Sequence, residues 1–78
     1  MREIKVLGTG CARCRALEGE VRRVVAELGL AAEVRKVSDM GEILSHGVMS
    51  VPALVVDGRV VVSGRVPSRE EIKRWLQE

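Results

Sequence analysis

The chain has 78 residues, of which 46% are hydrophobic, and Trp75 is its single aromatic residue. Thirteen Lys and Arg residues against eleven Asp and Glu residues leave a net charge of +2. This small charge, with its basic residues spread along the chain and no aromatic platforms for bases, argues against nucleic-acid binding. The length predicts a single domain over residues 1–78, with a core of Val, Leu, Ile and Ala.

The first residues predict a soluble protein without a leader segment. Residues 1–7 alternate charged and apolar side chains, which leaves no room for a signal peptide, and no apolar run reaches membrane-spanning length. We therefore expect a cytoplasmic protein that does not associate with membranes. In that compartment a Cys-x-x-Cys pair is more often catalytic or metal-binding than structural.

A strand and then a long helix are predicted for residues 4–29. Ile4 and Val6 share one face of the strand, and beyond a glycine-rich turn apolar residues recur at helical spacing up to Gly29, a typical C-cap. These residues are Cys14, Leu17, Val21, Val24, Val25 and Leu28. Gly19 inside this helix costs up to about 1 kcal/mol relative to Ala, and close packing is the reason we expect for it.

Residues 32–37 predict a second strand, which the connecting helix allows to pair in parallel with the first. Asp39 and Glu42 then form a pattern like a capping box, which opens a short helix. This helix is expected to end near His46-Gly47, where a histidine is favoured as a partner of the helix dipole over a metal ligand or base.

The C-terminal third predicts a hairpin and a last helix. Asp57-Gly58 suits a two-residue turn between strands over residues 51–56 and 59–62. Ser68 and Glu71 form a second capping box, after which Ile72, Trp75 and Leu76 supply a buried stripe. The predicted order of elements is βαβαββα.

Cys11 and Cys14 follow Gly8-Thr9-Gly10, at the predicted start of the first helix. The unpaired N–H groups and the positive end of the helix dipole stabilise an anion there, so one sulfur can be a thiolate near neutral pH. We predict that Cys11, exposed at or next to the N-cap, attacks and that Cys14, partly covered, resolves. Arg13 is expected to help lower the pKa of Cys11. The alternative is an inert pair of packed cysteines.

These motifs resemble those of thioredoxins and glutaredoxin-like proteins. Residues 8–14 (Gly-Thr-Gly-Cys-x-x-Cys), 52–58 (Pro-x-Leu-x-Val-Asp-Gly) and 64–66 (Gly-Arg-Val) are most similar to the small redox-active disulfide proteins of archaea and bacteria. The resemblance implies an α/β, thioredoxin-like fold. Its four-stranded mixed sheet would have the first strand inside and helices on both faces.

The resemblance also implies a cis Val51-Pro52 bond, with the Val51 backbone directed at a substrate near Cys11. An ordinary trans proline opening an edge strand is the alternative. Met49 and Val51 are expected to form an apolar lip beside the sulfurs, although core packing would also explain Met49. The expected substrate-binding residues are Gly10, Ala12, Arg13, Val51 and Pro52.

Two differences from better-known relatives bear on the mechanism. Lys5 occupies the strand position, six residues before the first cysteine, where thioredoxins carry a buried acid. Residues 63–66 lack the Gly-Gly and the acid with which glutaredoxins hold glutathione, although Arg65 could attract a carboxylate. We therefore expect a protein dithiol system, such as a thioredoxin-reductase-like enzyme, to be preferred over glutathione as the electron source.

Two functions fit the dithiol. The first is a monomeric thiol–disulfide oxidoreductase that needs no cofactor or metal and exchanges with protein disulfides through a mixed disulfide. The second is a soft-metal carrier that binds Cu(I), or zinc shared between two chains. Element order favours the first function, because heavy-metal-binding domains of the ferredoxin-like fold run βαββαβ and end in a strand.

Overall fold

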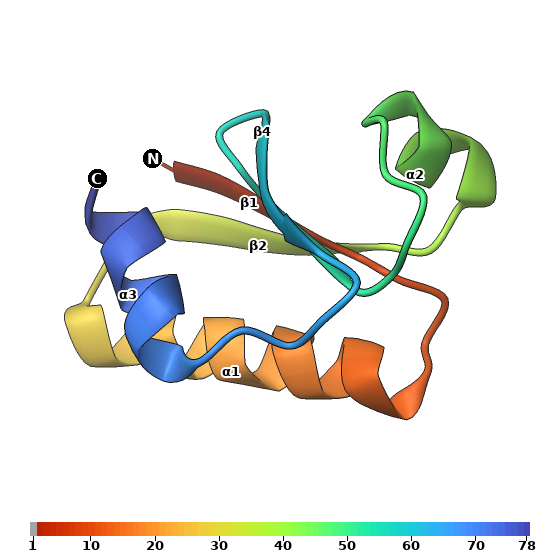
Figure 1. Cartoon of the computed structure of the whole chain (residues 1–78). Coiled ribbons are helices and arrows are strands. Elements are labelled where there is room, and N and C mark those ends of the chain that lie inside the picture. Colours follow the sequence, from red (N-terminus) through yellow and green to blue (C-terminus); the bar gives the residue numbers. More distant parts are fainter. Residues whose placement is uncertain (1) are drawn as a thin grey trace.

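Residues 2–78, the part of the chain that the computed structural model describes, form seven elements in the predicted order βαβαββα (Figure 1). They are β1 (Arg2–Leu7), α1 (Ala12–Leu28), β2 (Ala32–Val37), α2 (Met40–Ser45), β3 (Ala53–Val56), β4 (Arg59–Ser63) and α3 (Arg69–Gln77). Every helix in this part of the chain is too short or too polar to span a bilayer.

The four strands form one mixed sheet in the order β2-β1-β3-β4. β1 is parallel to β2 and antiparallel to β3, so it lies inside the sheet, as the resemblance implied. Leu7, the last residue of β1, is opposite Ala53, the first residue of β3. This register brings the chain that leaves β1 toward the cysteines next to the chain that enters β3 from Pro52.

Helices cover both faces of the sheet, which confirms the expected layering (Figure 1). Because successive strand side chains point to opposite faces, the neighbours Val6 and Leu7 enter different cores. The core under α1 and α3 consists of Ile4, Val6, Leu17, Val21, Val24, Leu54, Val56, Val62, Ile72 and Leu76. The core under α2 consists of Leu7, Val37, Ile43, Val48, Ala53 and Val55.

The helix ends follow the capping signals, with one exception. Gly29 ends α1 in the left-handed conformation, with φ of 62°, and Ser68 and Glu71 form the complete capping box at α3. At α2, Asp39 accepts the N–H of Glu42 at 2.9 Å. The Glu42 carboxylate instead lies 3.8 Å from the Lys5 ammonium, so only half of that capping box forms.

Two glycine predictions have different outcomes. The turn between β3 and β4 has positive φ at both Asp57 (50°) and Gly58 (84°), which confirms the two-residue turn. Gly19 is exposed, and outside the backbone of its own helix nothing lies within 4 Å of a Cβ built there. The expected close packing of Gly19 is therefore wrong.

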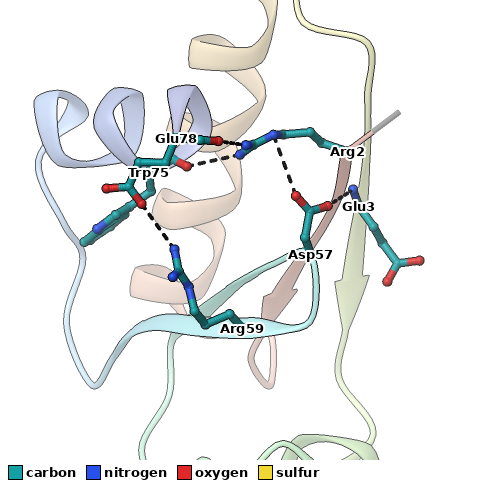
Figure 2. A network of polar contacts seen from close by, with 6 residues as sticks. All are labelled: Arg2, Glu3, Asp57, Arg59, Trp75 and Glu78. Atoms are coloured by element: carbon teal, nitrogen blue, oxygen red, sulfur yellow. Dashed lines mark hydrogen bonds and ion pairs between the residues drawn. The ribbon is translucent and has the colours of Figure 1, made fainter.

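A network of polar contacts joins β1, the β3–β4 turn and α3 (Figure 2). Arg2 donates to the backbone carbonyls of Trp75 and Glu78, and its guanidinium lies 3.7 Å from the Asp57 carboxylate. Arg59 donates to Glu78 at 3.2 Å. Trp75 is only partly buried, beside this network. The network ties the start of β1 to the end of α3.

Candidate active site

Cys11 is the N-cap residue of α1, and its backbone is extended, with φ of −68° and ψ of 169°. Its sulfur accepts the backbone N–H of Cys14 at 3.3 Å and lies 2.7 Å from the Cys14 sulfur. Cys11 is exposed, whereas Cys14 in the first turn is 3% exposed. Both are free thiols, and a disulfide needs an S–S distance of about 2.05 Å. The pair therefore combines an exposed thiol with a buried thiol whose sulfur lies in contact with it.

The pKa of Cys11 lies below its ordinary value. The main cause is the Cys14 thiol, which donates to the Cys11 sulfur, followed by the Cys14 backbone N–H. The Arg13 backbone N–H and positive charge act in the same direction, and desolvation acts against them to a smaller extent than the Cys14 contacts. The first turn of α1 thus favours a thiolate at the exposed cysteine.

Alkylation against pH tests this assignment. We expect iodoacetamide to modify Cys11 with a midpoint below that of an unstructured cysteine peptide, about 8.5. Cys14→Ala should raise the midpoint because it removes the donor hydrogen bond, and Cys14→Ser, which keeps an O–H donor, should raise it less. Peptide mapping by mass spectrometry identifies the modified residue. Faster modification of Cys14 below pH 7 would reverse the assigned roles.

Gly8 lies directly against Cys14, a contact that the sequence pattern did not predict. The Gly8 N–H donates to the Val37 carbonyl at 2.9 Å, which fixes the end of β1 against β2. A Cβ built on Gly8 would lie 2.5 Å from the Cys14 sulfur and 2.8 Å from its Cβ. Only a residue without a side chain allows the strand end to approach this closely. In the sequence, the signal for this contact is the glycine three residues before Cys11.

The segment before β3 lies at the same end of the sheet as the dithiol. The Val51-Pro52 peptide bond is cis, Pro52 is buried, and its carbonyl accepts the N–H of Gly64 at 2.9 Å. β3 lies between β1 and β4, so the alternative in which Pro52 opens an edge strand is wrong. The Val51 N–H and C=O make no backbone hydrogen bond with another loop, turn or cap of residues 2–78.

The other predicted site residues differ in exposure. Ala12 and Arg13 are exposed in the first turn of α1, and Gly10 precedes Cys11 with φ of 87°. Val51 packs partly on the core under α2, whereas Met49 is 95% exposed. The alternative in which Met49 packs in the core is therefore wrong.

Arg65, considered above as a possible partner for a glutathione carboxylate, already has a carboxylate partner. Its guanidinium donates to both oxygens of Glu71, at 3.0 and 2.8 Å. This contact, with the N–H of Ser68, lowers the pKa of Glu71 to about 2. Because Glu71 also completes the α3 capping box, Arg65 is part of the support of that helix.

The metal-carrier alternative is not supported by the fold. The chain continues from β4 into α3, so it does not have the order βαββαβ of the ferredoxin-like heavy-metal-binding domains. His46 is the C-cap residue of α2, as expected. Across residues 2–78, no group of three or more His, Cys, Asp or Glu side chains is placed to hold a metal ion.

Comparison with known proteins agrees with this geometry. The family model of the thioredoxin domain matches residues 2–77. The chain belongs to the thioredoxin family. It is 47% identical over 76 residues to a thioredoxin of Methanothermobacter thermautotrophicus, and the aligned residues cover 97% of this chain and 99% of that protein. It is 40% identical over 74 residues to a thioredoxin of Methanocaldococcus jannaschii, and the aligned residues cover 95% of this chain and 85% of that protein.

Family membership confirms the predicted fold and activity. The mixed sheet with helices on both faces is a thioredoxin-like α/β fold. The chain is a thiol–disulfide oxidoreductase of the thioredoxin family, and its substrates are in general protein disulfides.

Proposed function

We propose that Cys11 is the attacking nucleophile and Cys14 the resolving thiol of a dithiol cycle. The observation that carries this proposal is the contrast between an exposed Cys11, with its lowered pKa, and a buried Cys14 whose sulfur lies 2.7 Å away. A partner disulfide can reach only the first sulfur. The second sulfur would react after the first has formed a bond with the substrate.

The cycle has two exchange steps. The Cys11 thiolate attacks one sulfur of the substrate disulfide, the substrate S–S bond breaks, and its other sulfur leaves as a thiolate that takes a proton from solvent. Cys14 then loses its proton and attacks the Cys11 sulfur, which releases the second substrate thiol. Two electrons have passed to the substrate, and the protein holds a Cys11–Cys14 disulfide that a reductase must reduce.

The substrate chain would bind around the first turn of α1 and the segment before β3. Gly10, Ala12 and Arg13 flank the dithiol, while Val51 and Pro52 lie at the same end of the sheet. The Val51 backbone groups, which make no hydrogen bond to another loop or turn of residues 2–78, would pair with an extended substrate segment. We propose that residues 1–78 act as one monomeric domain in the cytoplasm, where a reducing environment keeps the dithiol free.

A protein dithiol reductase is proposed as the electron source. The pairing of Arg65 with Glu71 supports this choice, because it occupies the cation of residues 63–66, the stretch that corresponds to the one with which glutaredoxins hold glutathione. The test feeds the oxidised protein either NADPH with a thioredoxin-type reductase or glutathione with its reductase, during turnover of insulin disulfides. We expect saturable NADPH consumption with the first system and a rate near background with the second. Saturable turnover with glutathione alone would contradict the proposal.

A further inference from the structure

Three basic side chains lie near Gly10 and Cys11, and we call Arg13, Arg15 and Lys36 the basic rim. Arg13 lies between the two cysteines, and its charge lowers the pKa of Cys11. Arg15 donates to the Gly10 carbonyl at 3.2 Å. The Lys36 ammonium lies 3.9 Å from the position of a Cβ built on Gly10. Cations from α1 and β2 therefore converge on the residue that precedes Cys11.

The sheet register explains why Lys36 reaches this place. Lys36 is opposite Val6 in the parallel pairing of β1 and β2, so both side chains lie on the α1 face. Val6 is buried under α1, whereas Lys36 near the end of β2 is exposed. Lys36 was not among the predicted site residues, because this approach to Gly10 exists only in the folded chain.

No acid neutralises the basic rim. Among the ion pairs that residues 2–78 form within 4 Å, none includes Arg13, Arg15 or Lys36. The three acids of α1 are paired with other cations. Glu18 pairs with Arg22 of the same helix. Glu20 pairs with Arg69 of α3, and Glu27 pairs with Arg69 and Lys73 of α3. The chain has a net charge of only +2, and part of its unpaired positive charge lies beside Gly10, the residue that precedes Cys11.

We infer that the preferred partners are protein disulfides whose cysteines are flanked by Asp or Glu. This inference rests on the proposed roles of Cys11 and Cys14 and adds the substrate class. Complementary charge raises the rate of encounter, and acidic residues beside the cystine would meet the basic rim as the sulfurs approach. The Val51 N–H and C=O make no backbone hydrogen bond with another loop or turn of residues 2–78, which favours an extended peptide over a small anionic disulfide.

The test compares three disulfide-linked peptide dimers, Ac-X-Gly-Cys-Gly-X-NH2, in which X is Glu, Gln or Lys. The reduced protein is mixed with each, and each rate constant is divided by that for dithiothreitol, which corrects for the reactivity of the peptide disulfide. At about 20 mM salt we expect the Glu dimer to react about tenfold faster than the Lys dimer. Near 0.5 M salt, where screening is strong, the ratio should fall to about twofold.

Two charge variants localise the effect. Lys36→Gln should reduce the Glu-to-Lys rate ratio by about twofold at low salt, because it removes one of the three charges of the rim. Arg74→Gln removes the same charge from the exposed last turn of α3, at the opposite end of the molecule (Figure 1), and should leave that ratio unchanged. An equal loss in both variants would show an effect of net charge alone and overturn the assignment to the rim.

The remaining outcomes separate the two proposals. Equal normalised rates for all three dimers would leave the cysteine roles intact and overturn the acidic preference. Faster exchange with oxidised glutathione than with the Glu dimer would overturn the choice of peptides. If none of the three dimers exchanged, the proposed roles of Cys11 and Cys14 would fail first, and the inference with them.

Discussion

Replacing Cys14 by Ser should leave the protein covalently attached to its substrates. Cys11 keeps its exposed position at the N-cap of α1, so it should still attack a disulfide and form a mixed disulfide. The second step is then lost, because Ser lacks a thiol to displace the substrate from Cys11. We expect one adduct per chain, at Cys11, and no multiple turnover in an insulin reduction assay.

Intact-protein mass spectrometry measures the adduct directly, after the variant is mixed with a disulfide-linked peptide dimer. The matched variant is Cys11→Ser, which keeps the same number of thiols but retains only the buried one, 3% exposed. It should form almost no adduct and show no turnover. Adducts that accumulate on Cys14 in this variant as fast as on Cys11 in the other would contradict the division of roles.

Gly8→Ala should both destabilise the fold and slow closure of the disulfide. The added methyl would lie 2.5 Å from the Cys14 sulfur and 2.8 Å from its Cβ, so the strand end or the first turn of α1 must move. Overpacking of this kind costs about 1–3 kcal/mol. Any movement of Cys14 also changes the 2.7 Å separation of the two sulfurs. Urea unfolding measures the first effect, and the rate of mixed-disulfide resolution measures the second.

Gly19→Ala is the matched control for this substitution. It adds the same methyl group at an exposed position of α1, where no other part of the described chain lies within 4 Å of the new atom. Because Ala favours a helix interior over Gly, we expect the free energy of unfolding to rise by up to about 1 kcal/mol. Exchange kinetics should not change. If Gly8→Ala behaved like this control, the proposed contact with Cys14 would be wrong.

The order of elements was predictable because its signals are local. Gly29 and Ser68 mark the end and the start of helices through contacts within a few residues. Asp57-Gly58 marks its turn in the same way. Cys11 at the N-cap follows from the same kind of signal, since the glycine-rich turn separates a strand pattern from a helical one. The position of the first strand inside a mixed sheet was predicted from the family resemblance, and the full strand order comes from the structure.

The features that were missed depend on contacts between distant segments. The Glu42 carboxylate does not complete the predicted capping box and instead lies 3.8 Å from the ammonium of Lys5. Lys5 belongs to a strand far earlier in the chain. The roles of Gly8 and Lys36 require the end of β1, the end of β2 and the first turn of α1 to meet. No periodicity or spacing reports such meetings. The close packing predicted for Gly19 is wrong because this residue lies on an exposed part of α1, away from the other described segments.

The network in which Arg2 donates to the Glu78 carbonyl determines where another molecule can be attached without affecting exchange. This contact holds the two ends of the described chain side by side, at the end of the sheet away from the start of α1 (Figures 1 and 2). A group fused beyond Glu78, such as a tag, a surface linker or a second protein, would therefore lie at the end of the molecule opposite the dithiol. Cys11 would still face incoming partners, so an immobilised form should remain accessible to large substrates.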